Sequence, residues 1–125
     1  MANRFSTTKL GVPDLQAAAD FYGSVLGMEV GGKFAAYCEW ELLFPEGPRA
    51  QLIIYDTTNG TLAHRALGPS FLVFVVDDLK AVTDRFQAAG IGHVSEPKRA
   101  QEFGVDYVIT EDPFGNVIEL SQMIS

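Results

Sequence analysis

Residues 7–30 read TTKLGVPDLQAAADFYGSVLGMEV, and this stretch returns later in the chain in an altered form. Residues 71–94, FLVFVVDDLKAVTDRFQAAGIGHV, align with it without a gap at an offset of 64. In both copies an aspartate that can cap a helix precedes apolar residues at helical spacing, and a glycine that tolerates a left-handed conformation follows them. Each copy therefore predicts a strand, a capped amphipathic helix and a stop.

Short strand-like runs follow each predicted helix. They are residues 28–31, 34–44 and 50–55 in the first half, and 93–95, 107–110 and 116–121 in the second. The chain thus predicts an α+β fold of two β-α-β-β-β modules with curved mixed sheets. The modules are expected at about 5–56 and 69–123 within one domain, and the polar, turn-rich segment 57–68 is expected to link them.

The composition limits the function classes. The chain has 125 residues, 47% of them hydrophobic, which suits one compact domain with a real core. No apolar run is long enough to span a bilayer, and the N-terminal residues lack the apolar block of a signal peptide. The single Cys38 allows no internal disulfide, so a cytoplasmic location is expected.

The charge balance is acidic, with 16 acidic and 9 basic residues and a net charge of −7. This balance argues against nucleic acid as a partner, because a phosphate backbone binds basic surfaces. It fits a cationic or neutral ligand, although solubility alone is an alternative reason for it.

The segment DPFGNVIEL at 112–120 predicts a turn followed by a strand. By strand alternation, Glu119 shares a face with Val117 and Ser121. A carboxylate in this position is either solvated or has a role inside a cavity.

The two ends of the repeat carry a family resemblance. VPDL at 12–15, FY at 21–22 and LG at 26–27, together with DPFGNVIEL, resemble the vicinal oxygen chelate superfamily of glyoxalases, bleomycin-resistance proteins and extradiol dioxygenases. The resemblance spans nearly the whole chain. It implies that the two modules form their sheets around a cup.

In metal-using members of this family, four side chains from four strands hold the metal. The resemblance places these positions on Thr7, Leu52, Phe71 and Glu119, with Gln51 in place of Leu52 if the register slips by one. Only Glu119 is a strong ligand, whereas a zinc site needs about four donors. We therefore expect no metal and no other cofactor.

Two histidines are candidate substitute ligands. His64 lies in the expected linker and His93 just after the second helix. The alternative interpretations are a loop histidine and a half-exposed strand histidine.

A cup without metal ligands is a concave pocket, and we expect a mainly apolar lining with a few polar points. Lys9 is expected on the face of Thr7 and could pair with Glu119. The expected lining comprises Thr7, Lys9, Gly11, Leu52, Ile54, Phe71, Val73, Val75 and Glu119.

The run FAAYCEWELLF at 34–44, taken as one strand, leaves two alternatives. In the first, the face that carries Trp40 packs in the core and the acidic residues are solvated. In the second, Tyr37, Glu39 or Trp40 lines the cup. An aromatic face beside carboxylates would suit a flat cationic ligand.

Three functions remain open. The first is a binding protein that sequesters a small molecule, because drug-sequestering relatives are acidic and lack the metal. The second is a metal-dependent lyase, isomerase or dioxygenase of the same superfamily, and the third is a structural module that binds nothing. We also expect a homodimer, because edge strands of small open sheets need covering. If the cup forms across chains, Thr7 and Leu52 would face Phe71 and Glu119 of the partner subunit.

Overall fold

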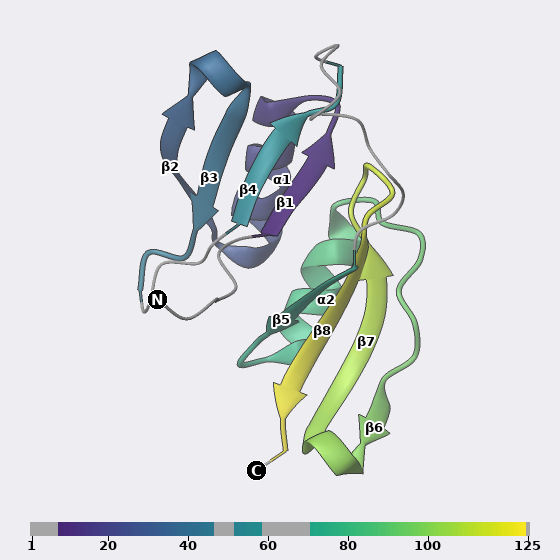
Figure 1. The fold of residues 1–125 in the computed structure, drawn as a ribbon. Helices are drawn as coiled ribbons and strands as arrows, with labels where there is room; N and C mark the ends of the chain where they lie inside the picture. The colour runs from purple at the N-terminus through teal and green to yellow at the C-terminus, as the bar shows by residue number, and fades with distance from the viewer. Residues whose placement is uncertain (1–7, 47–51, 59–70, 125) are drawn as a thin grey trace, which may run out of the picture. The chain divides into compact units, whose positions relative to one another are not determined.

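The computed structural model describes residues 8–46, 52–58 and 71–124. The chain divides into two compact units, residues 1–67 and 68–125. Each unit contains a four-stranded sheet and one α-helix (Figure 1), so the predicted α+β class and the repeated β-α-β-β-β order are confirmed. Much of the predicted linker, residues 59–68, lies outside the described residues.

The first unit has its strands in the order β1-β4-β3-β2. Strands β1 and β4 are parallel, and the other neighbours are antiparallel. Its elements are β1 (Thr8–Val12), α1 (Leu15–Leu26), β2 (Glu29–Phe34), the 3₁₀ turn η1 (Ala35–Tyr37), β3 (Glu39–Leu43) and β4 (Leu52–Asp56).

The second unit repeats this topology in the order β5-β8-β7-β6, with β5 and β8 parallel. The last strand of the unit in sequence thus lies inside the sheet, between β5 and β7 (Figure 1). Its elements are β5 (Phe71–Val75), α2 (Leu79–Ala88), β6 (Lys98–Ala100), the 3₁₀ turn η3 (Gln101–Phe103), β7 (Val105–Glu111) and β8 (Val117–Met123).

Both helices begin and end as the sequence predicts. The Asp14 side chain accepts a hydrogen bond from the Ala17 amide at 3.0 Å, and Asp78 accepts one from Ala81 at the same distance. These bonds satisfy one free N–H in each first turn. Beyond the helices, Gly27 has a φ of 78° and Gly90 a φ of 90°, the left-handed region that glycine adopts at low cost.

Each helix covers one face of its own sheet. In the first unit, Leu10 and Val12 are fully buried and α1 contacts β2, β3 and β4. In the second unit, Val82 and Phe86 of α2 are buried, and α2 contacts β7 and β8. Within each unit no helix covers the other face, which we call the open face.

The expectation of one long strand over residues 34–44 is wrong. Strand β2 ends at Phe34, the 3₁₀ turn η1 follows, and β3 begins at Glu39. The chain reverses through Cys38, whose φ is 54°. Positive φ is uncommon outside glycine, and the run has neither glycine nor proline to signal a turn.

The expected strand at 93–95 is also absent. Ser95 donates its amide to the Ile109 carbonyl at 2.9 Å, but its side-chain Oγ accepts from the Ile109 amide in place of a backbone carbonyl. Because a side chain substitutes for the backbone acceptor, no regular ladder forms here. The strand that pairs with β7 begins later, at Lys98.

Among the described residues, neither α1 nor α2 has the length and hydrophobicity needed to cross a bilayer.

Candidate functional site

The open face of the second unit carries several exposed apolar side chains. Residues directly opposite each other in neighbouring strands point to the same side of a sheet, so the strand register identifies this face. Phe71, Val73 and Val75 expose 60%, 56% and 67% of their surface. The side chains of this face on three neighbouring strands are Phe71, Val73 and Val75 of β5, Val117, Glu119 and Ser121 of β8, and Tyr107, Ile109 and Glu111 of β7.

Glu119 lies in the middle of this face. It is directly opposite Val73 on β5 and Ile109 on β7. The buried Ser121 hydroxyl donates to Glu119 Oε2 at 2.8 Å, and no other hydrogen bond fixes the Glu119 carboxylate within the described part of the chain. A half-buried carboxylate among apolar side chains can therefore accept further hydrogen bonds or neutralise a cation.

The open face of the first unit is more polar. It carries Lys9 of β1, Ile53 and Tyr55 of β4, and Glu39 of β3. Lys9 Nζ lies 2.7 Å from Glu39 Oε2. Lys9 thus has a partner in its own unit, Glu39, and the expected pairing with Glu119 stays a prediction.

Leu52 and Ile54 do not share the face of Lys9, so their expected placement is wrong. They lie opposite Thr8 and Leu10, and they are 6% and 0% exposed. Both pack in the core against α1. The two faces of β4 are thus exchanged relative to the expectation. Gln51, the alternative to Leu52, and Thr7 lie outside the described residues.

The aromatic residues of 34–44 divide between two positions. Trp40 lies opposite Ile54, on the helix side of the sheet, where Lys33 Nζ is 4.3 Å from its ring centroid. Tyr37 is 66% exposed in the turn η1. Trp40 thus lies on the core side of the sheet, as the first alternative had it. Glu39 lies on the open face, as the second alternative had it.

The residues at the implied metal positions fit a metal ion poorly. Leu52 and Phe71 have no donor atom, and Thr7 is not described. Across residues 8–46, 52–58 and 71–124, no group of three or more histidine, cysteine or acidic side chains could hold a metal ion. His93 is exposed, and His64 lies outside the described residues.

Tyr107 and Ile109, which were not among the predicted site residues, lie next to β8 on the open face of the second unit. The alternation within 107–110 is visible in the sequence. Which of its two faces meets Glu119, however, depends on the register between β7 and β8, and no residue pattern in either strand specifies that register.

Comparison with known proteins agrees with this architecture. The family model of the Glyoxalase/Bleomycin resistance protein/Dioxygenase superfamily matches residues 4–120 of the sequence. No curated protein matches the chain at a significant level.

Several solved structures are similar over almost their whole length. Lactoylglutathione lyase from Agrobacterium tumefaciens is 26% identical, with a TM-score of 0.70, and the match covers 97% of this chain and 94% of that one. The fosfomycin resistance protein FosX from Listeria monocytogenes is 16% identical, with a TM-score of 0.68 and coverages of 98% and 94%. A superfamily member from Sphaerobacter thermophilus is 17% identical, with a TM-score of 0.74 and coverages of 97% and 98%. The last two likenesses concern the fold alone.

Proposed function

This chain belongs to the glyoxalase/bleomycin resistance protein/dioxygenase superfamily, and we propose that it binds a small aromatic cation on the open face of its second unit. The observation that carries the proposal is the carboxylate of Glu119, set among exposed apolar side chains. Apolar surfaces with a few well-placed polar groups are typical of small-molecule sites.

The apolar part of the ligand would contact Phe71 and Val73. Phe71 is 60% exposed, so its ring is available for stacking with a flat ligand. Covering these side chains removes apolar surface from water, which is worth roughly 25 cal/mol per Å².

Glu119 would select for positive charge. Its carboxylate lies directly opposite Val73, so a cation that stacks on the apolar side chains can reach it. The Ser121 hydroxyl holds Oε2 at 2.8 Å and limits the movement of the carboxylate. A ligand that combines an aromatic body with a cationic group therefore uses both features of the face.

The first test is a titration with proflavine, a flat aromatic cation, followed by calorimetry. We expect Glu119→Gln to weaken binding about tenfold, because a hydrogen bond to a charged group is worth roughly 1.5–3 kcal/mol and partial exposure reduces that value. Phe71→Ala should also weaken binding, since it removes the stacking surface.

Glu96→Gln is the matched control, because Glu96 is exposed in the same unit and the substitution makes the same change in net charge. This variant should bind proflavine as the parent does. Equal affinities for the parent and Glu119→Gln would rule out the proposed site.

A second candidate function is a metal-dependent lyase, favoured by the 26% identity with lactoylglutathione lyase. The poor donor set at Leu52 and Phe71 opposes it. We expect purified protein to carry no stoichiometric zinc, nickel or iron by elemental analysis. A chelator should leave its melting temperature and its proflavine binding unchanged. About one metal ion per chain, lost together with an enzymatic activity on chelation, would place the lyase first.

A further inference from the structure

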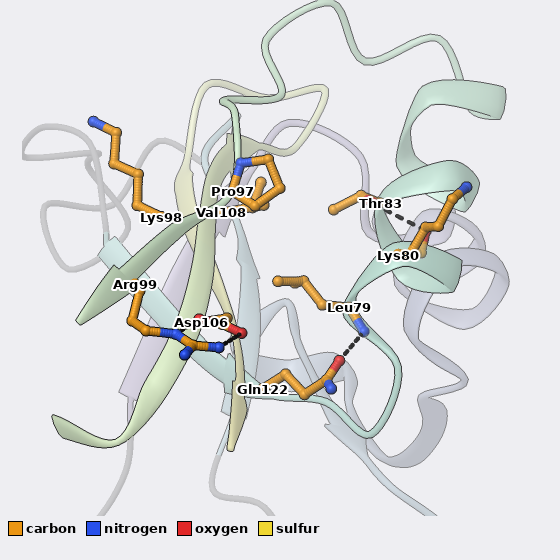
Figure 2. Close-up of a pocket in the computed structure, with 9 residues that line it drawn as sticks. All are labelled: Leu79, Lys80, Thr83, Pro97, Lys98, Arg99, Asp106, Val108 and Gln122. Carbon is orange, nitrogen blue, oxygen red and sulfur yellow. Dashed lines mark hydrogen bonds and ion pairs between the residues drawn. The ribbon is translucent and has the colours of Figure 1, made fainter. Parts of the chain in front are cut away.

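A pocket of about 560 Å³ lies on the helix side of the second unit's sheet, between α2 and the strands β6 to β8 (Figure 2). Its volume lies within the range of roughly 300–1,000 Å³ that is usual for small-molecule sites. We call it the helix-side pocket. Val108 lines it and is adjacent in sequence to Ile109 of the open face, so strand alternation places the pocket on the opposite side of the sheet from Glu119.

The walls of the helix-side pocket are largely apolar. Leu79 from α2 and Val108 from β7 form its inner side, and both are otherwise buried in the core. Thr83 points towards the pocket from the next turn of α2, and Pro97 closes it from the segment before β6 (Figure 2). These walls suit the apolar body of a small ligand.

Gln122 supplies an oriented polar group at one end of the pocket. Its Oε1 accepts a hydrogen bond from the Leu79 amide at 2.7 Å (Figure 2). This bond identifies the other end of the side chain as the amide NH₂. That NH₂ donates to no acceptor in the part of the chain that the structure describes, so it can bind an acceptor on a ligand.

The Arg99–Asp106 ion pair forms another wall. Arg99 Nε and Nη2 lie 2.8 and 3.1 Å from the two Asp106 oxygens. The hydrogen bond from Arg99 lowers the pKa of the Asp106 carboxyl below its usual value. The pair therefore stays ionised at neutral pH, and the remaining guanidinium N–H groups are further donors.

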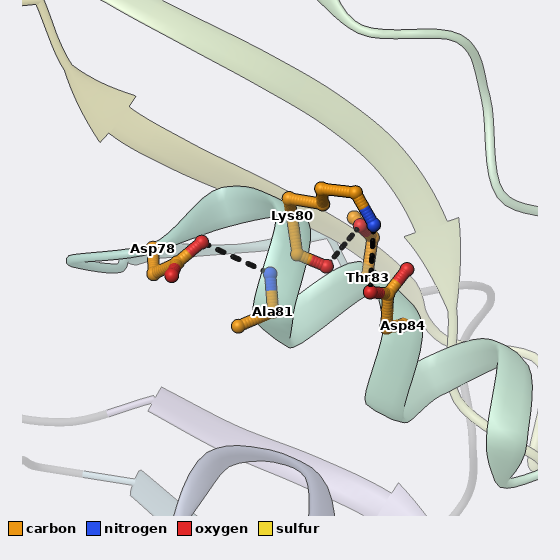
Figure 3. Close-up of polar contacts among 5 residues, drawn as sticks. All are labelled: Asp78, Lys80, Ala81, Thr83 and Asp84. Atoms are coloured by element: carbon orange, nitrogen blue, oxygen red, sulfur yellow. Dashed lines mark hydrogen bonds and ion pairs between the residues drawn. The ribbon is translucent and has the colours of Figure 1, made fainter.

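The charges at the helix-side pocket are largely balanced. Lys80 Nζ lies 2.9 Å from Asp84, one turn along the helix (Figure 3). The Lys98 side chain extends away from the other lining residues (Figure 2). A charged ligand would have to compete with these ion pairs, whereas an uncharged ligand would leave them intact.

We propose that the helix-side pocket is a second binding site, which takes a small uncharged molecule with an apolar body and a carbonyl-type hydrogen-bond acceptor. The apolar body contacts Leu79, Val108 and Thr83. The acceptor binds the Gln122 NH₂, with the free N–H groups of Arg99 as a second donor. This site is independent of the proposed site at Glu119.

The test uses acetanilide, an uncharged aromatic amide, with benzoate and benzylammonium as its charged counterparts. Methyl-resolved NMR of the full chain separates the two faces, because Leu79 and Val108 report on the pocket and Val73 and Val75 on the open face. Acetanilide should shift the Leu79 and Val108 methyls, with a dissociation constant on the order of 1 mM for a ligand of this size. Both charged probes should bind the pocket at least about tenfold more weakly, since the ion pairs oppose them.

Two pairs of proteins test the contacts. Thr83→Phe fills the pocket and should abolish the shifts, whereas Gln87→Phe, at an exposed position of α2 outside the pocket lining, should bind as the parent does. Gln122→Glu keeps the acceptor for the Leu79 amide but removes the NH₂ donor, so it should weaken acetanilide binding about fivefold relative to the parent.

Three results would overturn the helix-side site. They are acetanilide shifts confined to Val73 and Val75, unchanged binding by Thr83→Phe, and a preference for benzoate over acetanilide. Proflavine binding at Glu119 would be unaffected by any of them, so the two proposals fail separately.

Discussion

At the scale of single residues, Cys38 has a backbone conformation that glycine adopts more easily. Its φ is 54°, and its amide donates to the Ala35 carbonyl at 3.3 Å to close the turn η1. The second unit has Gly104 at the equivalent position, with a φ of 66° and a matching bond to Gln101 at 3.2 Å. The two units thus make the same turn with different residues.

Cys38→Gly should stabilise the protein by about 0.5 kcal/mol. The left-handed region costs a non-glycine residue roughly 1–2 kcal/mol, and the greater freedom of glycine in the unfolded chain offsets part of the gain. The melting temperature measured by calorimetry checks this prediction.

Gly104→Ala is the reciprocal control. A Cβ at Gly104 would meet nothing within 4 Å, so the substitution changes only the backbone energy. It should destabilise the protein by roughly 1 kcal/mol. A lower melting temperature for Cys38→Gly would contradict this account of the turn.

At the scale of elements, the helix α2 begins with one strong local interaction and one weak one (Figure 3). Asp78 caps the Ala81 amide at 3.0 Å, whereas the Lys80–Asp84 ion pair is exposed to solvent. Their side chains are close in sequence, yet they should contribute very differently to stability.

Asp78→Ala should destabilise the second unit by about 1 kcal/mol, because it leaves a first-turn N–H without its acceptor. Lys80→Ala should change the stability too little to measure, since water screens an exposed pair. Hydrogen exchange of amides in α2 measures both effects in the same unit. Similar losses of protection in the two variants would show that the cap does not dominate.

The helices were predictable from the sequence because their signals are local. Asp14 and Asp78 cap residues three positions away, and the apolar spacing that follows them extends over the whole helix. The turn at Cys38 was not predictable from its own residues. Gly104 marks the same turn in the second unit, but it lies 66 residues after Cys38, so the gapless alignment at an offset of 64 does not bring the two together.

The sequence also could not predict which residues of β4 face the helix. LIIYD is apolar at consecutive positions, so alternation cannot identify which residues face the helix. The parallel pairing of Leu52 with Thr8 determines which residues of β4 face the helix, and this pairing joins distant parts of the chain. The expected placement of Leu52 and Ile54 on the open face was therefore wrong, and the binding role of the other candidate residues stays a prediction.

At the scale of the whole molecule, the exposed apolar face of the second unit supports our proposal of a homodimer. Phe71, Val73 and Val75 are each more than half exposed, and a patch of this kind commonly marks an interaction site. Burial of Val75, at the end of β5, between chains would stabilise association and leave Phe71 and Val73 to the ligand.

We expect a dimer at micromolar concentration in analytical ultracentrifugation. Val75→Asp should shift the equilibrium towards monomer, because it would place a charge in the contact. Thr58→Asp, a charge added at an exposed residue of the first unit, should leave the dimer intact. A parent protein that sediments as a monomer would refute the proposal.

The position of β8 inside its sheet has a consequence for the order of events during synthesis. Strands β5 and β7 leave the ribosome before β8, yet both need β8 as their neighbour. Until it emerges, both strands present unpaired edges, on which a nascent chain can aggregate. In the first unit the sheet likewise cannot close until β4 has emerged. This happens much earlier, because β4 ends at residue 56. A nascent chain that has emerged as far as residue 111 would therefore hold a first unit with all its strands and a second unit that cannot yet close its sheet.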